Sequence, residues 1–357
     1  MNREDIYQQE SRSARRFGFL LAGLLVAALL SILLACMFGR LAIPGRTVLL
    51  AFLAQAGLAG PGSLDQTWQE VILQIRLSRI CLALLVGMAL AVAGTAFQGI
   101  LRNPLADPFT LGVSTGAACG ASLAIFLGLG AKTAWGLGLL PLAALAGAVA
   151  ALGAVLALGR VNGRLRRDTM VLAGIVVATF LSAFISLLKS LDEESVSSIV
   201  FWVMGSFQGR GWSHVLFALP YILTGLVIVG LKARELDLLS LGEMQARQMG
   251  VEVDQTRRLL LIGASLLTAG AVAVSGIIGF VGLVVPHLLR MLIGAEHRPL
   301  LILSGLLGGL ALLWSDVLAR VILPGGEELP VGVVTAILGG PFFCLLLKRR
   351  REGEGIG

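Results

Sequence analysis

Ten apolar runs, each about 17–25 residues long, most constrain what this chain can fold into, because a helix of that length crosses the hydrocarbon core of a bilayer. The runs are too long and too poor in period-two alternation for an outer-membrane β-barrel. Only 14% of the 357 residues are charged, against roughly 25% in an ordinary soluble domain, and the mean hydropathy is +0.90. The sequence therefore predicts an all-α polytopic membrane protein with about ten transmembrane helices.

The predicted spans are Phe17–Phe38, Ile80–Ile100, Phe109–Leu129, Leu137–Leu158, Thr169–Leu188, Val215–Leu231, Leu259–Ser275, Ile277–Ile293, Leu300–Ile322 and Val331–Leu347. The seventh and eighth are nearly continuous, so a nine-span chain remains an alternative, with Gly276 and Gly279 as the candidate hinge between them. The spans make one transmembrane domain, residues 17–347, which contains a polar loop at 232–258 and lies between tails at 1–16 and 348–357.

Basic residues indicate how the chain crosses the membrane, since cytoplasmic loops retain Lys and Arg. With ten spans and the N-terminus inside, 20 of the 28 Lys and Arg residues fall in inner segments and 8 in outer ones. The tryptophans fall near the outer ends, as an interfacial belt would place them: Trp68, Trp135, Trp202, Trp212 and Trp314. Both termini are therefore expected in the cytoplasm. The net charge of +7 follows from this topology, and no nucleic-acid partner is needed.

The stretch "RNPLADPFTLG" at 102–112 is polar, yet apolar runs flank it. Backbone in lipid must satisfy its own hydrogen bonds, so the segment either leaves the membrane or borders a protein-lined cavity. Pro104 and Pro108 stop a helix and push Asn103 and Asp107 toward extended geometry. A short turn at the membrane surface explains this stretch without any function.

The longest inner loop, Lys232 to Arg258, is too polar to span the membrane but carries several leucines and methionines. Glu243 and Arg247 are spaced as an i,i+4 pair on a short helix, which Gly242 and Gly250 would end on either side. Apolar residues on such a loop indicate packing against a protein or against the bilayer surface.

On the outer side, Arg76 and Arg79 precede the second span, and Arg320 lies one helical turn after Asp316. Asp316 and Arg320 are spaced to pair with each other. The first two arginines are suited either to anchoring in lipid headgroups or to docking an acidic partner.

Signals for catalysis or for a bound metal are thin. His214, His287 and His297 fall in three separate segments, and the four cysteines have no metal-like spacing. "GLGAKT" at 128–133 resembles the end of a phosphate-binding loop but lacks its required glycines, so the chain has no nucleotide site of its own. Few charges fall within the spans, which argues against a proton relay.

Four stretches, taken together, resemble the permease subunits of bacterial type II ABC importers for iron–siderophore, haem and cobalamin uptake, the FecCD family. They are "RLSRICLALLVGMALAVAGTAFQGILRNPLADPFTLGVSTGA", "LLSLGEMQARQMGV", "SGIIGFVGLVVPHLLR" and "ELPVGVVTAILGGPFFCLLL". The match covers nearly the whole chain after the first span. Ser78 departs from it, because the family commonly has Pro in this R-x-P-R motif, and a looser start of the second span is expected.

The resemblance implies a permease of the bacterial inner membrane that forms a homodimer around the translocation pathway. It also implies two cytoplasmic ATPase subunits, which hold the ATP and magnesium, and a periplasmic binding protein. By this match, the residues expected to couple the permease to the ATPase are Leu241, Gly242, Glu243, Ala246, Arg247 and Gly250. The residues expected to dock the binding protein are Arg76, Arg79 and Arg320. The cytoplasmic turn is formed by Arg102, Asn103, Pro104, Asp107 and Pro108.

The implied mechanism is alternating access, in which ATP-driven closure of the ATPase dimer rocks the helix bundles. The chain itself is then no enzyme and binds no cofactor or metal. An ion-coupled secondary transporter is the main alternative, and a membrane enzyme or a zinc or manganese permease fits less well. Ferric siderophores, haem and corrinoids share these motifs, and family frequency alone favours the first two.

Overall fold

The computed structural model describes residues 3–39, 41–58, 64–129, 137–161, 163–323 and 326–354. Trp135 and the end of the "GLGAKT" stretch lie outside these residues. Among the described residues, seven helices are long and apolar enough to cross a membrane, and three shorter apolar helices accompany them. The ten predicted apolar segments are therefore all helical, and the prediction of an all-α membrane protein is confirmed.

The long helices are α1 (Arg3–Met37), α4 (Leu77–Leu101), α6 (Leu140–Leu158), α7 (Arg167–Leu191), α9 (Trp212–Leu231), α12 (Val253–Ser275) and α14 (His297–Val321). The shorter apolar ones are α5 (Val113–Phe126), α13 (Val281–Ile293) and the first part of α15 (Val331–Glu354). Helix α1 begins well before Phe17 and α15 continues past Leu347, so both segments expected as tails are partly helical.

Shorter elements connect these helices. They are α2 (Gly45–Gln55), α3 (Gln66–Glu70), the π-helix η1 (Val71–Arg76), the 3-10 helix η2 (Pro108–Leu111), the hairpin β1 (Arg160–Val161) and β2 (Arg164–Leu165), α8 (Glu193–Val203), α10 (Ala233–Leu241) and α11 (Glu243–Gln248). The strands of the hairpin are antiparallel. Helices α3, η1 and α4 form one continuous helical stretch from Gln66 to Leu101.

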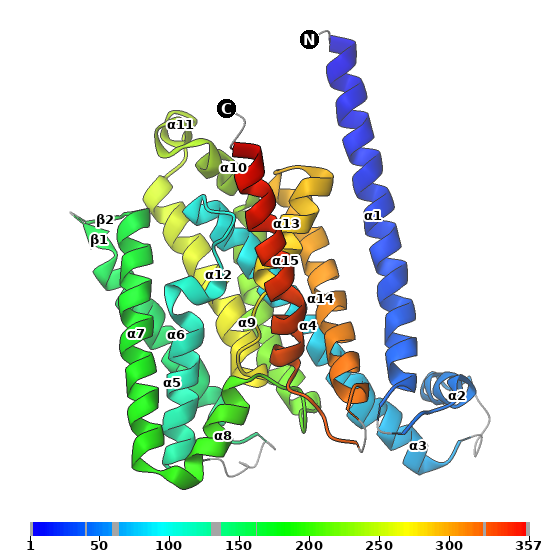
Figure 1. Cartoon of the computed structure of the whole chain (residues 1–357). Coiled ribbons are helices and arrows are strands. Elements are labelled where there is room, and N and C mark those ends of the chain that lie inside the picture. Colours follow the sequence, from blue (N-terminus) through cyan, green and yellow to red (C-terminus); the bar gives the residue numbers. More distant parts are fainter. Residues whose placement is uncertain are drawn as a thin grey trace.

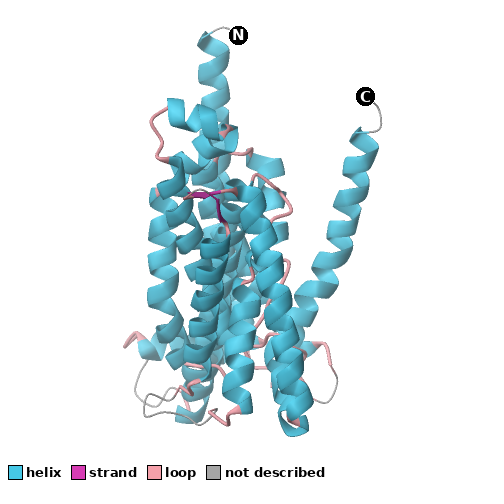
Figure 2. Ribbon diagram, turned by 90° about the vertical axis from the view of Figure 1, so that its left-hand side faces the viewer, coloured by secondary structure: helices cyan, strands magenta, loops and turns pink. Residues whose placement is uncertain are grey.

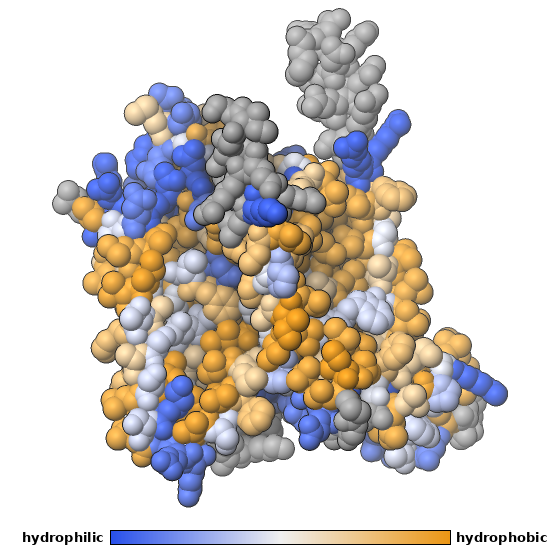
Figure 3. All heavy atoms as spheres, viewed as in Figure 1, coloured by the Kyte–Doolittle hydropathy of each residue, from blue (hydrophilic) through white to orange (hydrophobic). Residues whose placement is uncertain are grey.

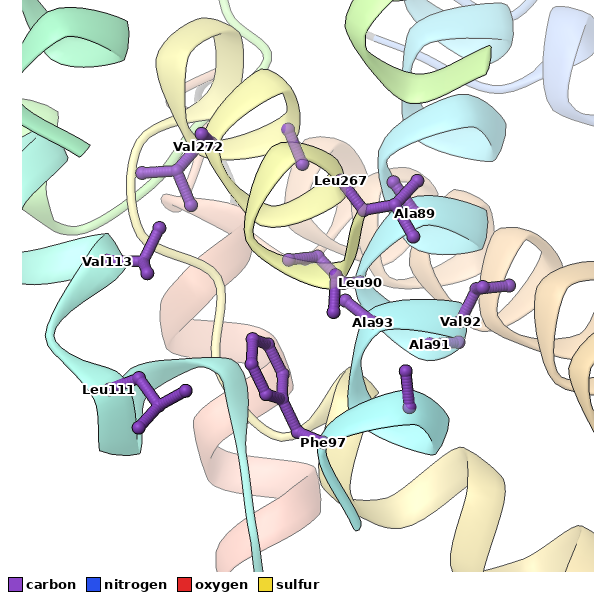
Figure 4. Close-up of a cluster of buried hydrophobic side chains, with 14 of the residues drawn as sticks. Ala89, Leu90, Ala91, Val92, Ala93, Phe97, Leu111, Val113, Leu267 and Val272 are labelled. Atoms are coloured by element: carbon purple, nitrogen blue, oxygen red, sulfur yellow. The ribbon is translucent and has the colours of Figure 1, made fainter. Parts of the chain in front are cut away.

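Helices α4, α12 and α14 form the buried centre of the bundle. In the helical stretch that ends with α4, and in α12, an apolar stretch of 18 residues is 78% buried inside the chain. The corresponding stretch of α1 is only 17% buried. Figure 4 shows side chains of α4, α12 and the start of α5 gathered in one cluster, with the ring of Phe97 directed between Leu90 and the segment carrying Leu111 and Val113. The outer helices expose their apolar faces, as a bilayer requires.

Glycines let the central helices approach closely, because small residues allow backbone-to-backbone packing in membranes. A methyl group at Gly94 of α4 would lie 1.9 Å from the carbonyl oxygen of Gly282 in α13. One at Gly120 of α5 would lie 2.1 Å from that of Ala143 in α6. Gly116 and Gly120 therefore pack α5 against α6.

An extended segment separates α12 from α13, so the two are distinct helices and not one continuous helix. Gly276 turns the chain with φ +72°, and Phe280 precedes α13 with φ +69°, whereas Gly279 has no such conformation. Helices α5 and α13 have 14 and 13 residues, so each is only about 20 Å long.

The two ends of the bundle differ in what they carry. Figure 1 shows α10, α11, the hairpin, the first turns of α1 and the last turns of α15 at one end, and α2, α3 and α8 at the other. Figure 2 shows the C-terminal half of α15 standing apart from the bundle. In Figure 3 hydrophobic residues form a broad band between hydrophilic ends, as expected of a chain that crosses a membrane.

Candidate functional sites at the two ends of the bundle

Helices α10 and α11 form a short angled pair at one end of the bundle. Gly242 separates them with φ 142° and ψ 153°, a conformation that disfavours any side chain. Gly250 ends the pair with φ +83°. The prediction that these two glycines bound a short helix is confirmed.

The α10–α11 pair packs against the bundle on its inner side and exposes apolar side chains on its outer side. Leu236 and Leu239 of α10 are buried, as is Ala246 of α11. Leu241 and Met244, by contrast, are 61% and 72% exposed. Met249 is 61% exposed as well. Large apolar side chains held outward by a fixed backbone indicate a contact surface.

Ion pairs hold α11 in place, although not the pair that the sequence suggested. Glu243 Oε1 lies 2.5 Å from Arg257 Nη2 of α12 and 3.5 Å from Arg167 Nε of α7. Arg247 Nη2 lies 2.9 Å from Asp254 Oδ2. The predicted Glu243–Arg247 pair is wrong, because each side chain finds an opposite charge on a neighbouring helix rather than on its own.

Arg257 of α12 connects three elements at this end of the bundle. Its side chain is 3% exposed, and it donates through Nη1 to the carbonyl oxygen of Leu165 in the hairpin while it pairs with Glu243. A cavity of about 560 Å³ lies between the hairpin and α11, lined by Arg164, Arg247 and Asp254 among others. The hairpin, α11 and α12 are therefore tied at one guanidinium group.

A second link connects α10 to α14. Asp237 Oδ1 accepts a hydrogen bond from the backbone N–H of His297 at 2.8 Å and lies 2.6 Å from its ring Nδ1. His297 is the first residue of α14 and is buried. Leu236 and the His297 ring both lie over Gly99 of α4, where a methyl group would meet them at 2.8 and 2.7 Å. Helix α10 is therefore in direct contact with both α4 and α14.

The turn at 102–112 folds through side-chain hydrogen bonds of its own. Arg102 ends α4 in the left-handed region with φ +50°. Asn103 Oδ1 accepts from the N–H of Leu105 at 3.0 Å, and Asp107 Oδ1 accepts from that of Phe109 at 3.0 Å. Such local caps replace the helical hydrogen bonds that Pro104 and Pro108 remove.

Arg102 and Asn103 at the start of this turn are exposed, whereas its second half enters the protein. A methyl group at Gly174 would lie 2.3 Å from the carbonyl oxygen of Thr110, and Gly174 is about 10 Å inside α7. One at Gly282 would lie 3.2 Å from Pro108 Cδ. The irregular backbone thus lies between α7 and α13, where protein shields it from lipid.

At the opposite end, Arg79 sits in a buried network of charges. It donates through Nη2 to Asp316 Oδ1 at 2.8 Å and through Nη1 to Glu328 Oε2 at 2.8 Å. Arg320 Nε lies 3.2 Å from the other oxygen of Asp316, so the predicted Asp316–Arg320 pair is confirmed. Asp316 is completely buried, and both guanidinium groups are largely so.

Arg76 is buried beside this network and bonds to backbone instead of carboxylates. Its Nη1 donates to the carbonyl oxygen of Cys36 at 2.6 Å, and its Nη2 donates to that of Leu41. Ser78 lies inside the helix between the two arginines, and its hydroxyl donates to the carbonyl oxygen of Gln74 at 2.5 Å. The arginines therefore fasten the α1–α2 connection and the loop before α15 to the start of α4.

The structure adds residues that the sequence did not single out. Arg257, Asp237 and Glu328 each bridge segments far apart in the chain, so spacing within one helix could not reveal them. Within the described part of the chain, no group of three His, Cys, Asp or Glu side chains could hold a metal ion.

Comparison with known proteins agrees with this architecture. The model of the FecCD transport family matches residues 24–349. The uncharacterised ABC transporter permease protein YvrB of Bacillus subtilis is 45% identical over 324 residues, which cover 90% of this chain and 91% of the relative. The hemin transport system permease protein HmuU of Yersinia pestis is 42% identical and covers 81% of this chain and 86% of its own.

A third relative is the cobalamin import system permease protein BtuC of Halobacterium salinarum. It is 41% identical, over 87% of this chain and 81% of its own. A solved structure described as a metal-chelate type ABC transporter in an inward-facing conformation superimposes with a TM-score of 0.79. That match is 34% identical and covers 93% of this chain and 99% of the other.

Proposed function

The chain belongs to the FecCD transport family, and from that premise we propose that it is the permease subunit of an ATP-driven importer for a metal chelate or a corrinoid. The solutes that we propose are an iron chelate, haem or a corrinoid. Relatives named for hemin and for cobalamin transport support this choice. The carrying observation is the α10–α11 pair, which shows apolar side chains outward and is bound inward to α4, α12 and α14.

ATP hydrolysis belongs to a separate subunit in this proposal, and so do the nucleotide and its magnesium. Leu241, Gly242 and Glu243, with Ala246, Arg247 and Gly250, form the part of the chain that the ATPase would grip. The alternative of an ion-coupled secondary transporter is set aside, because the related chains are named as permeases of ABC systems.

Transport by alternating access requires rigid levers and a pathway. Displacement of α11 would move α12 through Arg257, and displacement of α10 would move α14 through Asp237 and His297. On α7, Thr179, Ser182 and Ser186 are exposed on one side of an otherwise apolar helix. The hydroxyl groups of Thr179 and Ser186 donate to carbonyl oxygens one turn earlier in α7, so they are satisfied beside lipid as well as beside water. A homodimer around the pathway is part of the proposal.

The orientation follows from the charge bias. We place α10, α11 and both termini in the cytoplasm of a bacterial inner membrane, where basic loops belong. The opposite end would then receive a periplasmic binding protein. Arg79 and Arg320 lie there paired with Asp316 and Glu328, and Arg76 lies beside them bonded only to backbone carbonyl oxygens, so the three guanidinium groups outnumber the two carboxylates. We propose that their excess positive charge attracts acidic groups of the binding protein and that their bonds fix the docking surface.

The test is solute uptake by the permease reconstituted with its ATPase and binding protein in liposomes. Replacing Glu243→Ala together with Arg247→Ala should reduce uptake at least about tenfold, while the dimer assembles and ATP is still hydrolysed. The matched control is Glu252→Ala with Arg258→Ala, two exposed charges at the start of α12, which should transport normally. Normal uptake by the first double variant would refute the coupling role, and solute pumping without any ATPase would refute the transporter class.

A further inference from the structure

Two arginines beside α11 form a cationic surface that none of the functions described above uses. They are Arg164 of β2 and Arg166, which directly follows that strand, and we call them the hairpin arginines. The hairpin joins α6 to α7 at the end of the bundle that carries α10 and α11 (Figure 1). Both arginines are exposed, and both line the cavity of about 560 Å³ between the hairpin and α11.

The backbone of the hairpin holds these two side chains on one face. Successive residues of an extended chain point to opposite sides, and Leu165, which lies between the hairpin arginines, is buried. Arg166 keeps the extended conformation, with φ −99° and ψ 134°, before α7 begins. The carbonyl oxygen of Leu165 accepts a hydrogen bond from Arg257 Nη1, which fixes this backbone to α12. The two guanidinium groups are therefore displayed together by an anchored segment.

The two carboxylates that line the same cavity already have partners. Glu243 Oε1 lies 2.5 Å from Arg257 Nη2. Asp254 Oδ2 lies 2.9 Å from Arg247 Nη2. Among the described residues, neither hairpin arginine forms an ion pair. The wall of the cavity thus carries two positive charges that this part of the chain does not neutralise.

The position of the cavity favours a protein as the source of negative charge. A second copy of this chain would bring the same arginines, and like charges repel. Figure 1 shows α11 farther out along the bundle than the hairpin, so the cavity between them lies beyond the ends of α6 and α7 and not beside their apolar surfaces, where lipid would be. The cavity instead adjoins α11, whose exposed Met244 belongs to the proposed ATPase contact.

We propose that the hairpin arginines form a charged part of the ATPase contact and bind acidic side chains of that subunit. The inference rests on the proposed function and extends it beyond α10 and α11. Guanidinium–carboxylate pairs are directional and charge-assisted, so they fix the orientation of the partner and steer its approach. Because Arg166 immediately precedes α7, the ATPase would also hold the start of that helix.

The test is the affinity of the purified ATPase for the full-length permease in lipid nanodiscs, at about 150 mM and about 500 mM salt. Arg164→Glu with Arg166→Glu should weaken binding at least about tenfold at the lower salt. The loss should shrink at the higher salt, because ions screen exposed charges. The thermal unfolding midpoint should stay the same, since both side chains are exposed. Arg164→Gln with Arg166→Gln should weaken binding in the same direction but by less.

The matched control is Arg160→Glu with Arg258→Glu, which makes the same change of charge at the same end of the bundle. Both residues are exposed, and neither lines the cavity. This variant should keep its ATPase affinity within about twofold of the unchanged permease. Unchanged affinity in both variants of the hairpin arginines, or an equal loss in the control, would overturn the proposal.

Two further arms separate this inference from its alternatives. The loss should be the same in nanodiscs of phosphatidylcholine alone and in nanodiscs that also contain phosphatidylglycerol; a loss that requires the anionic lipid would assign the arginines to the membrane and overturn the proposal. Met244→Asp is measured in the same assay. If it abolishes ATPase binding while both variants of the hairpin arginines bind normally, the α11 contact stands and the hairpin inference fails. No binding by the unchanged permease would refute the proposed function itself.

Discussion

The two ends of the bundle treat their functional side chains in opposite ways. At the α10–α11 end, apolar side chains point outward, with Met244 72% exposed, while charged groups tie the backbone to the bundle. At the opposite end, the charged groups are buried, with Asp316 fully enclosed between two arginines. The first end has an apolar surface that its own chain leaves uncovered, whereas at the second end Arg79 and Arg320 are paired with carboxylates of the same chain.

This difference separates binding from stability. Substitutions on the exposed surface of α11 should affect assembly with a partner and leave folding intact. Substitutions in the arginine network should affect folding first, because removing one member of a buried network leaves the others uncompensated. The following variants test whether that division holds.

The largest effect is expected at Asp316. Asp316→Asn removes the charge that Arg79 and Arg320 share, and should destabilise the chain by about 3–5 kcal/mol. Thermal or denaturant unfolding of the purified permease measures this loss of stability. Glu327→Gln, an exposed carboxylate of the loop before α15, is the control and should change stability little. A stable Asp316→Asn protein would contradict the assignment of this network to folding.

Gly242 is expected to come next. Its φ of 142° is outside the regions open to other residues, so Gly242→Ala should cost about 1–3 kcal/mol or change the angle between α10 and α11. Stability and ATP-dependent uptake should both fall. Gly230→Ala, at a helical position with open space around it, should be neutral or slightly stabilising. Equal behaviour of the two variants would show that the angle is unimportant.

Met244→Asp should separate binding from stability most clearly. The side chain is exposed, so stability should change by no more than about 0.5 kcal/mol. Copurification of the ATPase should fall at least about tenfold, because a charge replaces an apolar contact. Gln248→Asp adds the same charge at an exposed polar position of α11 and should retain the ATPase better. Full retention by Met244→Asp would show that this surface is not the contact.

The smallest effect concerns Lys232 and Glu235, whose charged atoms are 2.7 Å apart at the start of α10. Partial burial acts to raise the pKa of Glu235, but the hydrogen bond and charge of Lys232 outweigh it, so the pKa lies below its usual value. The pair therefore stabilises the fold above the ordinary carboxyl pKa and loses that contribution as the pH falls through the lowered value. Glu235→Gln should cost under about 1 kcal/mol at neutral pH, and nothing in acid. A difference that grows in acid would contradict the assignment.

Much of the fold could be predicted because lipid imposes a length on each apolar run. The ten segments, the break at Gly242 and the Asp316–Arg320 pair all follow from local spacing. The helix bounds were less accurate: the second span extends from Ile80 back to Gln66, since η1 continues the helix beyond its apolar part.

What the sequence could not supply are contacts between distant segments. Arg79 meets Asp316 across 237 residues, and Glu243 meets Arg257 on another helix rather than Arg247 on its own. The depth of the turn at 102–112 likewise depends on Gly174 and Gly282, which admit its backbone between two helices. Local patterns predict helices, whereas tertiary packing decides which charges pair.

The central claim is that a separate ATPase binds the α10–α11 surface. The most direct measurement is photo-cross-linking in the assembled transporter, with the reactive amino acid at Met244 in one variant and at Leu58 in another. Leu58 is also exposed, at 76%, but follows α2 at the opposite end. We predict a cross-link to the ATPase from position 244 and none from position 58. An ATPase cross-link from position 58, with none from 244, would contradict the account.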